Sequence, residues 1–144
     1  MASEALTDKS AESRAVVLRT LDAFGRVDLQ ALYSTFKDDV VWDVIGGSYL
    51  PQGGHYVGKE AVIQTFLVGF VTACFDFTAP FKFEIKSVSA DGPTVVVEWF
   101  MSAKTVRGLS YENNYCVVFT VTHGQVQSVR EYTDTAYQLR VLFE

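Results

Sequence analysis

Residues 111–135 read YENNYCVVFTVTHGQVQSVREYTDT, and this stretch decides the class of fold. It holds two runs rich in β-branched and aromatic residues, 111–122 and 125–134, which only His123-Gly124 separates. A short glycine-containing separator between two such runs is typical of an antiparallel hairpin. The stretch therefore predicts two long neighbouring strands near the C-terminus.

Two more strand-like runs precede this hairpin, at 81–89 and 94–106. Their separators, Asp91-Gly92-Pro93 and Arg107-Gly108, again have the chemistry of turns that join antiparallel neighbours. The second half of the chain is therefore predicted to be an antiparallel meander.

The first half instead carries apolar residues at helical spacing, with a glycine-rich loop after a short β-branched run. The predicted elements are a helix at 9–24, a shorter helix capped by Asp28, a strand at 40–45, a loop at 46–54, a helix at 59–75 and a last helix at 136–143. Helices first and a meander afterwards indicate the α+β class, with one domain over 1–144.

Composition limits the partners of the chain. A net charge of −5 argues against nucleic acid, because phosphate binding needs a concentrated basic surface. No apolar run approaches the roughly 20 residues of a membrane helix, and the polar N-terminus does not resemble a signal peptide. The expected partner is a small molecule, because the aromatic residues, 14% of the chain, suit a ligand pocket as well as a core.

The two cysteines, Cys74 and Cys116, each lie in an apolar stretch, which favours two reduced thiols in a cytoplasmic protein over a disulfide. His55 and His123 have no ligand spacing with another strong ligand, so no metal site is expected.

The long strands are expected to twist and curl, leaving a cone-shaped interior under the helices. Phe100, Val117, Phe119 and Val121 are assigned to the opposite, outer face of the sheet. Because an apolar outer face must be covered, a homodimer through this face is predicted. The alternative is that these are ordinary half-buried positions.

Several local strings resemble a known superfamily: FKDDVVW (36–42), GHYVGKE (54–60), HGQV (123–126) and VREYTDT (129–135). Together with the element order they resemble the NTF2-like proteins, and most of all the SnoaL-like branch related to ketosteroid isomerases. The resemblance implies a cone in which N-terminal helices pack on the concave face of a strongly bent antiparallel sheet. It also implies chemistry without a cofactor, but it does not choose an activity.

The isomerase pattern is not kept. The resemblance places Val44 where the isomerase base stands, Thr20 at its tyrosine and Cys116 at its oxyanion-binding acid. These residues supply neither the base nor the strong donors, so steroid isomerisation by that route is not expected.

The limonene-type epoxide hydrolase pattern is also broken. Trp99 and Met101 stand at that enzyme's arginine and acid. Trp42 and Val44 stand at its tyrosine and asparagine. Only Asp134 matches, at the base, so epoxide opening by that machinery is not expected either.

In the SnoaL-type polyketide cyclases the catalytic aspartate follows a turn glycine at the offset that Asp134 has from Gly124. The resemblance therefore implies that Asp134 is the acid/base group. The alternative is that Asp134 caps the last helix. Alternation puts Arg130, Tyr132 and Asp134 on one face, so Arg130 could also pair with Asp134; it puts Glu131 on the other face.

His55, in the glycine-rich loop, is a second catalytic candidate, with a solvent-exposed loop histidine as the alternative. The resemblance places Cys116 inward, and alternation then sends Asn114 inward too, with Asn113 and Tyr115 on the outer side. The residues expected to contact substrate are Trp42, Val44, Tyr49, Tyr56, Trp99, Met101, Asn114, Cys116, Arg130 and Tyr132.

Three hypotheses follow. The first is a SnoaL-like enzyme of the cyclase or isomerase type that uses acid–base chemistry on an apolar, oxygen-bearing substrate. The second is a non-catalytic binding protein for an apolar small molecule. The third, a dimerisation module with a filled interior, predicts no cavity at all.

Overall fold

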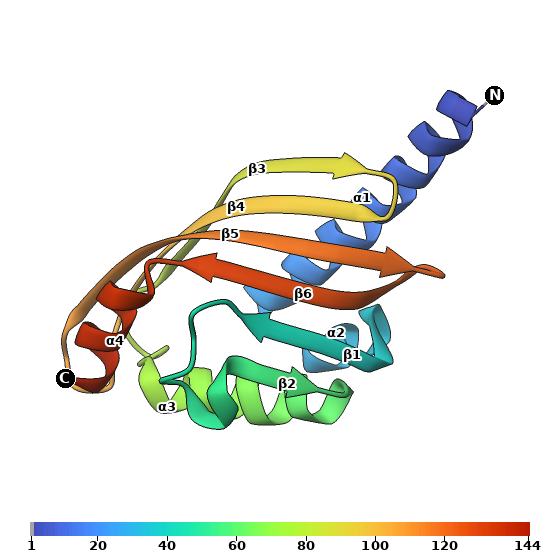
Figure 1. Ribbon diagram of the computed structural model, residues 1–144. Helices are drawn as coiled ribbons and strands as arrows, with labels where there is room; N and C mark the ends of the chain where they lie inside the picture. The colour runs from blue at the N-terminus through green and yellow to red at the C-terminus, as the bar shows by residue number, and fades with distance from the viewer. Residues whose placement is uncertain (1) are drawn as a thin grey trace.

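The computed structural model describes residues 2–144 and combines helices with one six-stranded sheet (Figure 1). The helical elements are α1 (Ala2–Arg26), α2 (Leu29–Thr35), η1 (Pro51–Gly54), η2 (Ala61–Phe70), α3 (Val71–Cys74) and α4 (Thr135–Phe143). The strands are β1 (Phe36–Val44), β2 (His55–Val57), β3 (Lys82–Asp91), β4 (Thr94–Lys104), β5 (Ser110–Thr122) and β6 (Gln125–Thr133).

The sheet has the order β2-β1-β6-β5-β4-β3, and every neighbouring pair is antiparallel except β1 and β6, which run parallel. The prediction of an antiparallel sheet is therefore wrong for this one pair. The meander itself follows from local turns, whereas the β1–β6 pair joins segments about 90 residues apart, for which no turn sets the direction. The pair splits the sheet into the predicted meander and a β1–β2 hairpin.

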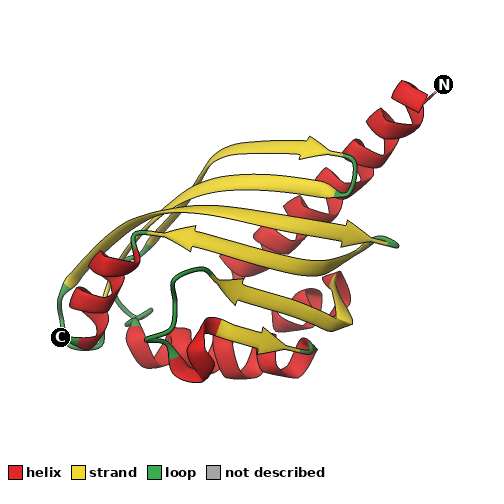
Figure 2. Ribbon diagram, in the orientation of Figure 1, coloured by secondary structure: helices red, strands yellow, loops and turns green. Residues whose placement is uncertain are grey.

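The helices cover one face of the bent sheet, as the NTF2-like cone requires (Figure 2). The long α1 packs against β3, β4, β5 and β6, while α4 closes the end of β5. Asp28 caps α2 as predicted, because its Oδ1 accepts a hydrogen bond from the Ala31 amide at 3.1 Å. Of the helices in the described part of the chain, none is long and apolar enough to cross a membrane.

The helix predicted at 59–75 is present, but its centre is wound differently. Residues Ala61–Phe70 form a π-helix that runs directly into α3. π-Helical turns are rare in proteins, and those that occur are often found at functional sites. In this chain the wider winding places Phe66 and Phe70 against the interior of the cone.

The facing of β5 differs from the prediction. Asn113, Tyr115, Val117 and Phe119 point into the core, and Cys116 and its even-numbered neighbours point outward. The predicted alternation was correct in period but shifted by one residue. The centre of this strand is apolar on both faces, so alternation alone does not fix which face is buried.

The shift removes most of the support for the predicted homodimer. Val117, Phe119 and Val121 are buried within a single copy of the chain and not on an outer face. Phe100 does lie outside, where the ammonium groups of Lys82 and Lys86 each lie 6.0 Å from the centre of its ring. The homodimer stays a prediction, without three of the four residues on which it depended.

Candidate functional site

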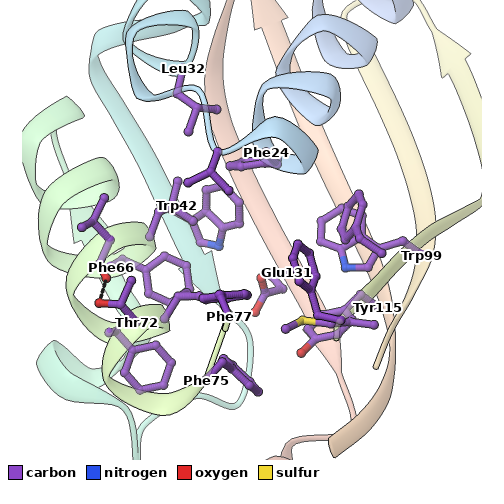
Figure 3. A pocket seen from close by; sticks show the side chains of 18 of the residues that line it. Phe24, Leu32, Trp42, Phe66, Thr72, Phe75, Phe77, Trp99, Tyr115 and Glu131 are labelled. Atoms are coloured by element: carbon purple, nitrogen blue, oxygen red, sulfur yellow. Dashed lines mark hydrogen bonds between the residues drawn. The ribbon is translucent and has the colours of Figure 1, made fainter. Parts of the chain in front are cut away.

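A cavity of about 430 Å³ lies between the helices and the concave face of the sheet (Figure 3). Its walls are almost entirely apolar, and aromatic rings from both layers face one another across it. The lining residues share this character: Phe24, Leu32, Trp42, Phe66, Phe70, Phe75, Phe77, Phe81, Phe83, Trp99 and Met101 are among them. A dimerisation module with a filled interior is therefore excluded.

Glu131 is the one charged side chain among the described residues that line this cavity. In the described part of the chain, the other strongly polar lining groups are the hydroxyls of Thr72 and Tyr115 and the amide of Gln138. Figure 3 shows the Glu131 carboxyl on the cavity wall between Trp42 and Tyr115. A largely apolar cavity with a few polar groups at one place is the usual form of a small-molecule site.

The register of the sheet explains this grouping. Glu131 of β6 pairs with Val44 of β1 on one side and with Val117 of β5 on the other. Trp42 and Tyr115 each stand two residues before these partners, so their side chains project from the same face as Glu131. Three neighbouring strands thus present an indole, a carboxyl and a phenol in one row.

Trp99 extends the row by one strand. It pairs directly with Tyr115 across β4 and β5, and the two rings stack at 5.6 Å between centroids. On the other side Phe66 lies 5.5 Å from Trp42. Such aromatic contacts hold the rings rigidly, so the cavity keeps its shape around Glu131.

The Glu131 side chain is in a medium that disfavours its charge. The residue is 7% exposed, and no described Lys, Arg or His forms an ion pair with it. Burial raises the pKa of its carboxyl to about 7, and the Trp42 indole partly offsets that rise. The Trp42 Nε1 itself has no hydrogen bond of ordinary geometry to a described residue.

A chain of hydrogen-bonded polar side chains begins at Tyr115, which lines the cavity on the strand next to Glu131. Tyr115 Oη lies 2.6 Å from Tyr111 Oη, which in turn accepts hydrogen bonds from the amides of Asn113 and Gln138. Burial is the main cause that raises the pKa of Tyr111 to about 12, and it raises the pKa of Tyr115 well above its usual value. Both phenols therefore stay protonated at neutral pH.

Among the predicted contact residues, Trp42, Trp99 and Met101 line the cavity. Val44 and Tyr56 are buried beside it without lining it, and the Tyr56 hydroxyl donates to the Pro51 carbonyl instead. Tyr49 reaches the site indirectly, because its hydroxyl donates to Gln138 Oε1 at 2.5 Å.

Four predicted contact residues lie on the wrong side of the sheet. Asn114, Cys116, Arg130 and Tyr132 belong to the outward-facing positions of β5 and β6 and line no part of the cavity. The cause is the one-residue shift in facing described above, which exchanges the two faces of a strand. The same shift assigned Glu131 to the outside.

Asp134 does not line the cavity; it is the N-cap of α4. Its Oδ1 accepts a hydrogen bond from the Tyr137 amide at 2.9 Å, so the alternative reading of this residue is the one that the geometry shows. Arg130 forms no ion pair with it among the described residues. His55 lies in β2, exposed, where its Nδ1 contacts the Asp43 carboxylate and not the cavity.

The capping role of Asp134 gives a first prediction. Asp134→Ala should lower the free energy of unfolding by about 0.5–2 kcal/mol, because the first turn of α4 loses its side-chain acceptor. Asp134→Asn keeps an acceptor without the carboxylate, and it should stay close to the wild type. Urea unfolding of the three proteins measures this. Equal destabilisation by both substitutions would mean that the carboxylate charge matters instead.

Sequence reasoning missed Glu131, and no clear signal pointed to it. Strict alternation groups Glu131 with Val129 but puts Val126 on the other face of β6, with Arg130 and Tyr132, so neither face is clearly the more apolar. In the structure the pairing of β6 is irregular near its start, and Val126, Val129 and Glu131 are all buried. A bulge of this kind cannot be read from alternation.

No group of three or more His, Cys, Asp or Glu side chains lies close enough together in the described residues to hold a metal ion. The cavity offers one carboxylate and no imidazole or thiol, so we propose no metal for it.

Comparison with known proteins agrees with this architecture. The model of the SnoaL-like domain matches residues 17–129. An NTF2-like protein of unknown function from Burkholderia pseudomallei K96243 superposes with a TM-score of 0.79 at 22% identity, over 92% of this chain and 98% of that one. No curated protein sequence matches the chain.

Two further solved structures are similar. TerC, co-crystallised with polyporic acid, has a TM-score of 0.78 at 19% identity, covering 92% of this chain and 99% of its own. A SnoaL-like polyketide cyclase, so described without proof of activity, from Jannaschia sp. CCS1 has a TM-score of 0.75 at 17% identity, covering 92% of each chain. At these identities the likeness shows the fold alone.

Proposed function

Since this chain belongs to the SnoaL-like domain family, we propose that its cavity is the active site of a small-molecule enzyme. The proposed chemistry is general acid–base catalysis, of the cyclase or isomerase type, on an apolar substrate that carries oxygen. The reaction needs no cofactor, because a positioned carboxyl can remove and return a proton by itself.

One observation carries the proposal: Glu131 is the one charged side chain among the described residues that line a largely apolar cavity, and burial raises its pKa to about 7. A base with a pKa near the working pH is half deprotonated and still strong enough to accept a proton. Buried carboxyls are unfavourable unless a function requires them, so perturbed groups in cavities are good candidates for catalysis. Glu131 therefore replaces Asp134 as the proposed acid/base group.

The apolar walls supply the rest of the proposed mechanism. They exclude water from the Glu131 carboxyl, which strengthens its interaction with a substrate proton. They also restrict a flat or cyclic substrate to few orientations between Trp42 and Trp99, because the two indoles lie on opposite sides of Glu131 in the row across the sheet. The resemblance in fold to a protein described as a SnoaL-like polyketide cyclase is consistent with this substrate class.

A binding protein without catalysis is the second candidate. The observation that favours it is the cavity wall, which is apolar apart from a handful of groups. A carrier needs only such walls, and it gains nothing from a carboxyl that burial holds at a pKa of about 7. The two candidates therefore differ in what Glu131 does.

Exchange of the acidic benzylic protons of β-tetralone with solvent deuterium tests the enzyme. This bicyclic ketone is apolar and small enough for the cavity. The wild type should accelerate exchange over buffer by about 10²- to 10⁴-fold, the usual range for a positioned base, and Glu131→Gln should abolish the acceleration. Proton NMR in deuterated buffer follows the signal directly.

The pH profile adds an independent readout. Exchange should rise as the pH passes through about 7, because only the deprotonated carboxyl accepts a proton. The matched control is Glu98→Gln, a carboxyl on the outer face of β4 that accepts from Ser87, and it should leave exchange unchanged. Binding of β-tetralone without accelerated exchange would favour the carrier.

A further inference from the structure

We infer that the Tyr115 hydroxyl donates its hydrogen to an oxygen atom of the bound ligand, next to Glu131. This inference rests on the proposed function for its site, but it concerns binding and names the ligand chemistry: an apolar molecule with a ketone or similar acceptor oxygen. It follows from the directions of the hydrogen bonds around Tyr111, which leave only one possibility for Tyr115.

The first hydrogen bond whose direction is determined is the one between Asn113 and Tyr111. Its Oδ1 accepts from the Asn114 amide at 3.0 Å, and its Nδ2 lies 3.2 Å from the Asp134 carbonyl oxygen. A backbone amide can only donate and a carbonyl can only accept, so the side-chain amide has one consistent orientation. Its Nδ2 therefore also donates to Tyr111 Oη, at 3.0 Å.

The orientation of the Gln138 side-chain amide follows from the lengths of its two contacts. Its contact with the Tyr49 hydroxyl is 2.5 Å, and its contact with Tyr111 Oη is 3.3 Å. The shorter distance is ordinary between two oxygens and too short for a nitrogen donor. The Gln138 oxygen consequently faces Tyr49, and its Nε2 donates to Tyr111.

Tyr111 Oη thus accepts two hydrogen bonds, from Asn113 and Gln138. A hydroxyl has two acceptor positions and one hydrogen, so it has no further capacity to accept. The remaining contact, 2.6 Å to Tyr115 Oη, must be one in which Tyr111 donates. Tyr115 is the acceptor, and its own hydrogen takes no part in this chain.

That hydrogen has no acceptor among the described residues, for Tyr111 is the only hydrogen-bond partner that Tyr115 Oη has there. Tyr115 lines the cavity on the strand next to Glu131, and Figure 3 shows its oxygen at the cavity wall. A buried donor without a partner is unfavourable, and a ligand oxygen would satisfy it. The chain of donors from Asn113 through Tyr111 also polarises the Tyr115 hydroxyl and strengthens its donation.

The protonation state agrees with this role. Burial raises the pKa of Tyr115 well above its usual value, so the hydroxyl keeps its hydrogen wherever the protein is folded near neutral pH. Its donation should therefore not vary across the range in which Glu131 titrates.

Two probes of the same shape test the inference: β-tetralone, and tetralin, which lacks the oxygen. Binding of both probes is measured by isothermal titration calorimetry, and the change in the intrinsic fluorescence of Trp42 and Trp99, which line the cavity, reports whether it occurs there. Tyr115→Phe should weaken β-tetralone binding about tenfold, the usual effect of one hydrogen bond of about 1.4 kcal/mol. It should leave tetralin binding unchanged.

Asn113→Asp provides a second variant. An aspartate can only accept from Tyr111, which turns the chain around and draws the Tyr115 hydrogen toward Tyr111. The preference for β-tetralone over tetralin should fall as it does in Tyr115→Phe. Tyr132→Phe, on the outer face of the same sheet, is the matched control and should change neither affinity.

Equal loss of both probes in Tyr115→Phe, or no loss of either, would overturn the inference. These outcomes are independent of catalysis, because Glu131 is intact in every variant and only binding is measured. The wild type could fail to accelerate exchange while Tyr115→Phe still weakens the binding of β-tetralone and not that of tetralin. In that case the proposed catalytic function is wrong, and the hydrogen bond from Tyr115 to the ligand oxygen stands. If exchange depends on Glu131 but Tyr115→Phe binds both probes normally, the reverse holds.

Discussion

Replacing Glu131 by glutamine should remove most of the pH dependence of stability between about pH 5 and about pH 8. In the wild type, burial raises the pKa of this carboxyl from 4.5 to about 7. The unfolded chain therefore loses the proton at lower pH than the folded protein does. Folding binds a proton in this window, and the free energy of unfolding must fall as the pH rises.

The sign and size follow from this difference. The stabilisation is fully present below pH 4.5, declines as the pH rises, and is lost once the pH has passed about 7. One pKa unit corresponds to about 1.4 kcal/mol, so the wild type should lose roughly 2–3 kcal/mol between about pH 5 and about pH 8. Glu131→Gln carries no charge at either pH and should be the more stable protein above pH 7.

Urea unfolding at several pH values measures the effect. Glu84 titrates with a pKa near 2, because the side chains of Lys82 and Lys86 bond to it, so its contribution falls well below this window. Glu98→Gln, on the outer face, is again the control and should keep the slope of the wild type. A Glu131→Gln protein with an unchanged slope would show that this carboxyl is not held protonated by burial.

Phe119→Ala should lower the free energy of unfolding by about 3–5 kcal/mol, the second large effect expected. Phe119 is 0% exposed within one copy of the chain, in the core between its strand partners Val95 and Val129. Removing its ring leaves a cavity that rigid neighbouring strands cannot fill. The loss should not depend on protein concentration.

Val118→Ala is the matched control, because Val118 neighbours Phe119 on the other face of β5 and is only half-buried. It should cost about 1 kcal/mol or less. Urea unfolding at two protein concentrations separates the two placements of Phe119. If the cost of Phe119→Ala disappears at high dilution, where any dimer has dissociated, the residue serves an outer interface and not the core.

Local signals were sufficient for most of the fold. The turns at Asp91-Gly92-Pro93, Arg107-Gly108 and His123-Gly124 set the meander, and the Asp28 cap set the start of α2. Such signals act between residues close in the chain, so sequence contains them in full. The parallel pairing of β1 with β6 was not predicted, because it forms across most of the chain and no turn encodes it.

The composition of the site depends on which face of each strand points into the core, and alternation alone does not determine this. Trp42, Trp99 and Met101, which the resemblance placed in the site, do line the cavity. In β5 and β6 both faces carry apolar residues near the centre, and a shift of one residue exchanged them. The choice of Asp134 came from the resemblance, and an inward Asp134 placed Glu131 on the opposite face of β6.

The sequence by itself determined the α+β class and the C-terminal meander, and its resemblance to the SnoaL-like proteins indicated the cone. Only the tertiary structure decided which carboxyl enters it. A strand of period two has two equally regular phases, and the packing of α1 and the register with β1 select one of them. That selection buries Glu131 beside Tyr115 and leaves Asp134 as the cap of α4.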